Sequence, residues 1–220
     1  LAQEGYNRIP LVAEAFADLE TPLSLYLKLA HVQNNGDRSF LLESVVGGER
    51  FGRYSFIGLP ARTLLRASGF GDAAKTEVVT DGLVVETVTG NPLNFVADYQ
   101  KRFKVALREG LPRFCGGLAG YFGYDTVRHI EKKLVHSCPP DDLGMPDILL
   151  LQTEELAVID NLSGKLSLIV YADPVQPDAY AKAHARLAEL KQRLKAPAQA
   201  PSIAPCASHP AERSFAKDDY

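Results

Sequence analysis

The sequence has little cysteine, no long apolar run and no concentrated positive charge. Its three cysteines are an odd number without C-x-x-C spacing, which is typical of reduced thiols in a reducing compartment. No apolar stretch approaches the roughly 20 residues that cross a bilayer. No charged leader with an apolar core is present either. We therefore expect a cytoplasmic protein without a membrane partner.

The charge balance argues against nucleic acid as a partner. Lys and Arg total 24 against 27 Asp and Glu, and the formal net charge is −3. The basic residues are scattered, whereas proteins that grip phosphate backbones concentrate them. Hydrophobic residues make up 46% and charged residues 23% of the chain, which is ordinary for a globular protein. This composition excludes collagen-like, coiled-coil and wholly disordered chains.

Motifs of a self-contained active site are missing as well. The chain has no H-E-x-x-H motif, no Cys/His cluster at metal-ligand spacing and no G-x-S-x-G elbow. Its five histidines lie far apart in the sequence. From the residues alone we predict no catalytic residue and no metal ligand in this chain.

Helices are predicted where a capping residue precedes apolar residues at helical spacing. Thr21-Pro22 and Asn91-Pro92 each place a capping side chain before proline, the residue favoured at the first helical position. The second of these helices is expected to end near Gly110, and a third is expected over 178–194. Leucines also alternate from residue 23 to residue 29, so a strand remains the alternative for the first helix.

Strands are predicted in neighbouring pairs. Asp81-Gly82 is a strong two-residue hairpin signal between two apolar segments. Four glycines between residues 116 and 123 indicate a strand pressed against another backbone. The predicted strands cover 40–45, 53–59, 62–67, 76–80, 83–88, 116–124, 148–159 and 166–171. Pairs of strands with helices between them indicate an α+β fold with mainly antiparallel sheets.

The composition changes after residue 195. Residues 196–211 include four prolines and few large apolar side chains, which is typical of a linker. We therefore expect a domain over 1–195, a Pro/Ala-rich linker over 196–212, and the truncated start of a second domain over 213–220.

One strand end carries side chains suited to an amino acid. In Leu41-Leu42-Glu43-Ser44, the carboxylate could pair with an ammonium group. The hydroxyl and nearby backbone N–H groups could meet a carboxylate. Judged from the residues alone, a solvated strand end is the simpler interpretation of this segment.

Several segments together resemble one known family. Residues 39–59 read SFLLESVVGGERFGRYSFIGL, residues 115–131 read CGGLAGYFGYDTVRHIE, and residues 146–160 read PDILLLQTEELAVID. With the early segments 6–10 and 21–23, they resemble the N-terminal half of anthranilate synthase component I. The resemblance covers nearly the whole chain outside the linker.

The resemblance implies a fold of orthogonally packed antiparallel sheets flanked by helices. It implies a parent enzyme, a carbon–oxygen lyase, that converts chorismate and ammonia to anthranilate and pyruvate in tryptophan biosynthesis. A glutamine amidotransferase subunit supplies the ammonia. Chorismate and Mg²⁺ are bound in the catalytic half, of which only 213–220 resemble the beginning. The 220-residue chain is therefore expected to be inactive alone, with no catalytic and no metal-binding residue.

The resemblance also assigns the strand-end motif to L-tryptophan, the feedback inhibitor of the family. Glu43, Ser44 and Val45 stand at the positions that the family uses, and Arg53 and Tyr54 are weaker candidates from the next strand. Three alternatives stay open: component I of aminodeoxychorismate synthase, a non-catalytic amino-acid-binding module, and a purely structural half.

Overall fold

The computed structural model describes residues 1–31, 38–43, 52–137, 141 and 143–199. The strands are β1 (Ile9–Phe16), β2 (Phe40–Leu42), β3 (Tyr54–Gly58), β4 (Thr63–Ser68), β5 (Lys75–Thr80), β6 (Leu83–Thr89), β7 (Gly117–Phe122), β8 (Ile148–Thr153), β9 (Glu155–Asp160) and β10 (Lys165–Ala172). The α-helices are α1 (Pro22–Leu29), α2 (Pro92–Gln100) and α3 (Ala179–Leu194). Four short 3-10 helices cover Ala2–Glu4, Gly71–Ala73, Tyr124–His129 and Lys132–Leu134.

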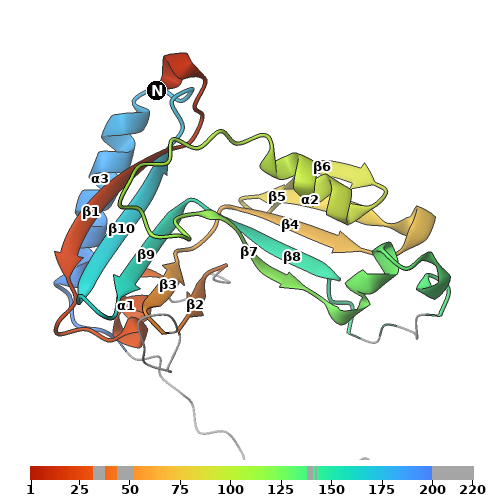
Figure 1. The fold of residues 1–220 in the computed structure, drawn as a ribbon, viewed down its shortest axis with the longest axis horizontal. Coiled ribbons are helices and arrows are strands. Elements are labelled where there is room, and N and C mark those ends of the chain that lie inside the picture. Colours follow the sequence, from red (N-terminus) through yellow and green to blue (C-terminus); the bar gives the residue numbers. More distant parts are fainter. Residues whose placement is uncertain (32–37, 44–51, 138–140, 142, 200–220) are drawn as a thin grey trace, which may run out of the picture.

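The strands form two five-stranded sheets. Sheet I has the order β1-β10-β9-β3-β2, and sheet II has the order β6-β5-β4-β8-β7. All the strand pairings within them are antiparallel. The strands of the two sheets run in clearly different directions, with α1 and α3 against sheet I and α2 against sheet II (Figure 1). The predicted α+β fold with antiparallel sheets and flanking helices is confirmed.

Two segments of chain pass from one sheet into the other. Strand β8 of sheet II continues into β9 of sheet I with only Glu154 between them. Strands β3 and β4 make the same passage through residues 59–62. The single strand predicted over 148–159 is therefore wrong, because its two halves belong to different sheets. The strand breaks where the apolar pattern meets two consecutive glutamates.

Each sheet has its own apolar core. The core of sheet I lies against α1 and α3 and includes Leu25, Leu29, Ile57, Leu168 and Leu190, all fully buried. The core of sheet II lies beneath α2 and includes Leu65, Val96, Tyr99 and Ile148. The helices thus bury one apolar face each and leave their polar faces to solvent.

The helix starts are confirmed, but one helix end is not. Thr21 and Ser24 form a reciprocal capping box at α1, so the alternative strand there is wrong. The side chain of Asn91 accepts from the backbone N–H of Leu93 at 2.9 Å. Helix α2 ends at Gln100, well before Gly110, because the chain beyond it pairs with residues 7 and 8 instead.

The hairpin signal is confirmed, and one strand was not expected at all. Asp81 and Gly82 both have positive φ, 51° and 85°, as a two-residue turn between β5 and β6 requires. Strand β1 is the unexpected one. It pairs along its whole length with β10, which lies about 150 residues further along the chain.

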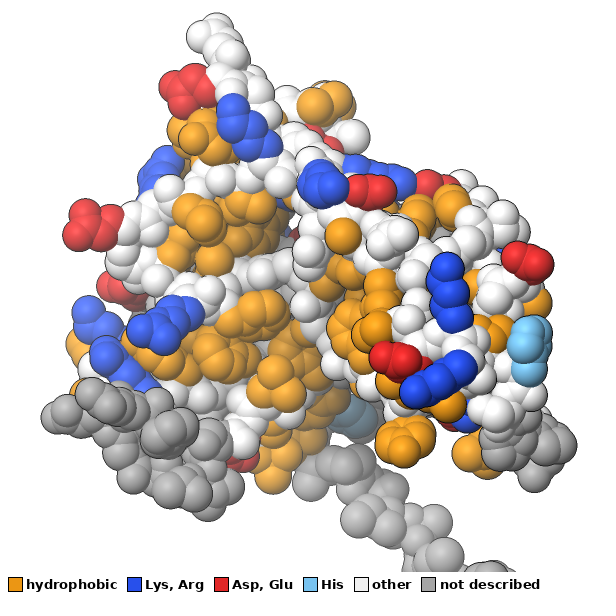
Figure 2. All heavy atoms as spheres, turned by 45° about the vertical axis from the view of Figure 1, so that its right-hand side comes forward, with side chains coloured by type: hydrophobic (Ala, Val, Ile, Leu, Met, Phe, Trp, Pro, Cys, Tyr) orange, Lys and Arg blue, Asp and Glu red, His pale blue; other side chains and the backbone are white. Residues whose placement is uncertain are grey.

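Apolar side chains remain exposed around both sheet I and sheet II, as Figure 2 shows for one face of the molecule. Leu83 and Val85 on the edge strand β6 are more than half exposed. So are Phe122, the last residue of β7, and Tyr124, the first residue of the following 3-10 helix. Exposed apolar surface of this kind is typical of contact surfaces. In the described part of the chain, no helix has both the length and the apolar character to cross a membrane.

The glycine-spaced strand is confirmed as one that presses against its neighbour. A Cβ atom at Gly120 in β7 would overlap the carbonyl of Leu149 in β8. We predict that Gly120→Ala destabilises the fold by about 1–3 kcal/mol, the usual cost of forced overpacking. The reverse change one residue earlier, Ala119→Gly, should cost only about 0.5–1 kcal/mol. Urea unfolding followed by circular dichroism checks both, and equal costs would contradict the close approach.

Candidate functional site

The predicted site residues that the structure describes lie together at one end of sheet I. Leu42, the last residue of β2, pairs with Phe56 in the antiparallel strand β3. Glu43 therefore leaves β2 at the end of the pair where β3 begins with Tyr54. The side chain of Glu43 is exposed. Ser44 and Val45 lie outside the described residues.

Arg53 is held by a carboxylate that comes from a distant segment. Its Nε and Nη2 donate to Oδ1 and Oδ2 of Asp160 at 3.2 and 2.9 Å. The same guanidinium lies 5.0 Å from the ring centroid of Tyr54, a cation–π distance. Asp160 pairs with Tyr54 across β3 and β9, which explains why the three side chains meet. The hydrogen bonds from Arg53 hold the pKa of Asp160 below its ordinary value.

Asn161 fixes the entry into β3. Its Nδ2 donates to the carbonyl of Gly52 at 3.0 Å and to Oγ of the fully buried Ser55 at 3.1 Å. Neither Asp160 nor Asn161 was predicted from the sequence as part of the site. The sequence shows a carboxylate and an amide directly after an apolar strand, which could have marked them as site residues. It does not show which distant residues they bind.

Aromatic side chains form the surface beside these polar groups. The ring of Phe114 lies 5.6 Å from that of Phe56 and 6.4 Å from that of Phe40. The ring of Tyr54 lies 6.1 Å from that of Phe56. Gly58 leaves room for the Phe40 ring, which a Cβ atom there would overlap. The aromatic cluster of Phe40, Tyr54, Phe56 and Phe114 thus covers the inner face of sheet I next to Arg53.

The described residues at this end of the sheet could bind a ligand, but they include no set of groups for covalent chemistry. It offers an exposed carboxylate, a guanidinium neutralised by Asp160, and aromatic surface. None of these side chains is a nucleophile with an adjacent base. Within the described ranges, no three His, Cys, Asp or Glu side chains gather closely enough to hold a metal ion.

The Arg53–Asp160 pair should contribute stability in a pH-dependent way. Because the folded pKa of Asp160 is lowered, this contribution is fully present above its unfolded pKa of about 3.9 and is lost as the pH falls through the folded value. Arg53→Gln should therefore cost up to about 1 kcal/mol at pH 7 and less at pH 3. Urea unfolding at both pH values measures the difference.

A matched variant controls for the loss of a surface charge. Arg113 has no hydrogen bond or ion pair to another residue of the described chain, so Arg113→Gln should show no comparable change between pH 7 and pH 3. A cost of Arg53→Gln that stays constant at both pH values would contradict the assigned pair.

The similar proteins named below carry the same protein name. No protein-family model matches the chain. The chain is 55% identical over 197 residues to anthranilate synthase component 1 of Neisseria meningitidis serogroup B, a match covering 88% of this chain and 38% of that protein. It is 52% identical over 199 residues to anthranilate synthase component 1 of Pseudomonas aeruginosa, covering 90% and 39%.

A solved structure shares the fold. The crystal structure of anthranilate synthase component I from Streptococcus pneumoniae matches with a TM-score of 0.51, over 84% of this chain and 37% of that one, at 22% identity. This likeness concerns the fold alone. The chain spans a little over a third of the length of the curated relatives it matches. Along nearly nine-tenths of its length, the chain is therefore similar in sequence to part of proteins named anthranilate synthase component 1.

Proposed function

We propose that this chain is the tryptophan-sensing part of an anthranilate synthase component I. The parent enzyme would convert chorismate and ammonia to anthranilate and pyruvate, with a glutamine amidotransferase subunit supplying the ammonia. The observation that carries the proposal is the 55% identity to a protein named anthranilate synthase component 1. Chorismate and Mg²⁺ would bind in the rest of the parent protein, so this chain would be inactive alone. The expected cytoplasmic location is part of the same proposal.

In the proposed site, polar groups at the strand end would bind the charged part of tryptophan, and apolar side chains would bind its indole ring. Glu43 is exposed, and its side chain has no hydrogen bond or ion pair to another residue of the described chain. It would accept the ammonium group of the amino acid. Ser44 and neighbouring backbone N–H groups would meet the carboxylate, and Val45 with the aromatic cluster would offer apolar surface to the indole.

Arg53 would hold neighbouring side chains in place and would not itself bind the carboxylate of tryptophan. Two of its donors are engaged by Asp160, at 2.9 and 3.2 Å, so the charge of the guanidinium is compensated. Its contact with Tyr54 would hold that ring at the edge of the aromatic cluster. The charge that distinguishes this end of the sheet is then the carboxylate of Glu43.

Feedback inhibition would follow if tryptophan binds one arrangement of the parent enzyme better than another. A ligand shifts an equilibrium only by its difference in affinity for the two states. The apolar side chains exposed on both halves of this chain support a contact surface for the rest of the parent protein.

The activity is tested with the full-length protein. Mixed with chorismate, Mg²⁺ and ammonia, it should produce anthranilate, detected by its fluorescence, and L-tryptophan should lower the rate. Consumption of chorismate without anthranilate would favour the aminodeoxychorismate synthase alternative. Absence of consumption would favour the binding-module or structural alternative.

The assignment of Glu43 is tested by a matched pair of variants. Glu43→Gln should raise the tryptophan concentration for half inhibition by about tenfold or more, because a charge-assisted hydrogen bond is lost. Glu14→Gln changes another exposed glutamate, on β1 at the opposite edge of sheet I, and should leave inhibition unchanged. Unaltered inhibition in Glu43→Gln with normal anthranilate formation would remove Glu43 from the site and leave the enzyme assignment standing.

A further inference from the structure

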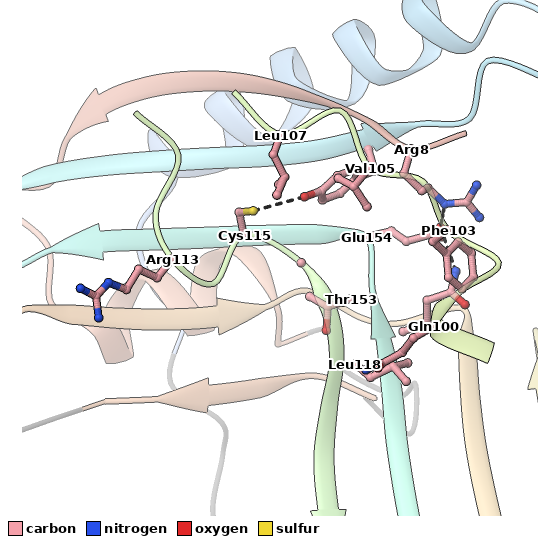
Figure 3. Close-up of a pocket in the computed structure, with 14 residues that line it drawn as sticks. Arg8, Gln100, Phe103, Val105, Leu107, Arg113, Cys115, Leu118, Thr153 and Glu154 are labelled. Atoms are coloured by element: carbon pink, nitrogen blue, oxygen red, sulfur yellow. Dashed lines mark hydrogen bonds and ion pairs between the residues drawn. The ribbon is translucent and has the colours of Figure 1, made fainter. Parts of the chain in front are cut away.

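A cavity lies where the two sheets meet, away from the strand end discussed above. It has a volume of about 320 Å³. Its walls come from the start of β1, the segment 100–118, the junction of β8 and β9, and β10 (Figure 3). We call it the corner cavity. Neither Glu43 nor Arg53 nor Tyr54 lines it.

Most of the wall is apolar. Phe103, Val105, Leu107 and Leu118 line it together with the ring of Tyr171. Gly116 is needed at one side, because a Cβ atom there would come within 2.6 Å of the Tyr171 ring. The main chain is thereby brought close to the ring. Such walls accept an apolar ring and exclude a strongly hydrated ligand.

The polar rim is built around Glu154. Its Oε1 accepts from Nε of Arg8 at 2.8 Å and from Nε2 of Gln152 at 2.9 Å. Gln152 in turn accepts from the hydroxyl of Tyr99 at 2.6 Å. Within the described chain, the second carboxylate oxygen of Glu154 receives no hydrogen bond. This oxygen therefore remains as an acceptor, and the buried Oγ1 of Thr153, which also lines the cavity, has no hydrogen-bond partner in the described chain either.

The charges at the cavity are compensated within the described chain, except that of Arg113, which has no ion pair there. Arg8 pairs with Glu154 and also lies 3.4 Å from Asp173. Arg113 lines the cavity, but its guanidinium points away from Cys115 (Figure 3). No uncompensated charge faces the apolar walls, so a neutral ligand fits better than an ion.

We propose that the corner cavity binds a small neutral ring compound that carries one O–H or N–H donor. The ring would lie among the apolar side chains, and the donor would meet the second oxygen of Glu154. An apolar cavity of roughly 150 Å³ already holds a benzene molecule, so the volume here suits one ring with a substituent. The proposal does not depend on the proposed function, because it uses only residues of this chain that line the cavity.

Cys115 provides a local readout. It lies in the cavity wall, is 7% exposed, and its Sγ accepts from the hydroxyl of Tyr171 at 3.5 Å. A small thiol reagent must enter the cavity to reach it. Trypsin cuts after Arg113 and Arg128, so this cysteine lies alone in the peptide 114–128 and its labelling can be followed by mass spectrometry.

The experiment measures the labelling rate of Cys115 by methyl methanethiosulfonate in the full-length protein, with N-acetylcysteine as an internal reference. Phenol should slow the labelling in a saturable way by several-fold. Toluene lacks the donor and benzoate carries a charge, so both should need about five- to tenfold higher concentrations for the same effect. Equal effects of the three probes, or no effect of phenol, would overturn the proposal.

Two neighbouring glutamates supply the matched variants. Glu154→Gln should remove the advantage of phenol over toluene. Glu155→Gln alters an ion pair with Arg186, outside the corner cavity, and should preserve that advantage. If Glu154→Gln does not fold, Leu107→Trp serves instead, because this side chain is 69% exposed and a larger ring would fill the cavity from its mouth. Phenol should then produce no further slowing, and retained slowing would overturn the proposal.

The result is independent of catalysis. Protection of Cys115 in a protein that forms no anthranilate would support the corner cavity and remove the proposed function. Anthranilate formation without any protection of Cys115 by phenol would support the proposed function and overturn the proposal for the corner cavity.

Discussion

The arrangement of the two sheets depends on the bend at Glu154, and an ion pair with Arg8 holds that residue. Glu154 is the single residue between β8 and β9, where the chain leaves sheet II for sheet I. The carboxylate at this junction is only partly buried, with its side chain 38% exposed, and both Arg8 and Gln152 donate to it. Arg8 comes from the segment that enters β1, and the main chain around it pairs with residues 104–106 beyond α2. One side-chain contact therefore joins the N-terminal strand, the bend and the segment that leaves α2.

Local chemistry explains which elements could be predicted from the sequence. A threonine or asparagine before a proline starts a helix through bonds to residues two or three positions away. Asp81 and Gly82 both adopt the positive φ that their two-residue turn requires, which these residue types tolerate. The end of α2 is different. Helical spacing continues through Phe103 and Leu107, yet the chain unwinds there because residues 7 and 8 take the backbone hydrogen bonds. Strand β1 and the bend at Glu154 likewise depend on partners far away in the sequence.

The same limit applies to the candidate site. The pattern of leucines, glutamate and serine could be recognised because its residues are consecutive, and Arg53 and Tyr54 follow on the next strand. Asp160 is 107 residues from Arg53, and only the pairing of β3 with β9 brings it there. Phe114 reaches Phe40 and Phe56 from a segment without regular structure. Neighbouring residues could thus be predicted as a site, whereas the distant side chains that hold Arg53 and the aromatic rings in place could not.

One short segment, residues 114–116, packs against sheet I on the side of the aromatic cluster. Phe114 packs against the aromatic cluster near the strand end, and the next residue, Cys115, contacts Tyr171 in the wall of the corner cavity. Gly116 then lets the chain pass close to Tyr171 and the carbonyl of Thr153. Because consecutive side chains serve the two places, a shift of this segment large enough to move Phe114 would also move the cavity wall. Polar groups stand at the strand ends and the bend, where the backbone leaves the sheet, while the surface between them is apolar. That distribution follows from the sheet itself, since its middle has no spare backbone donors and its ends do.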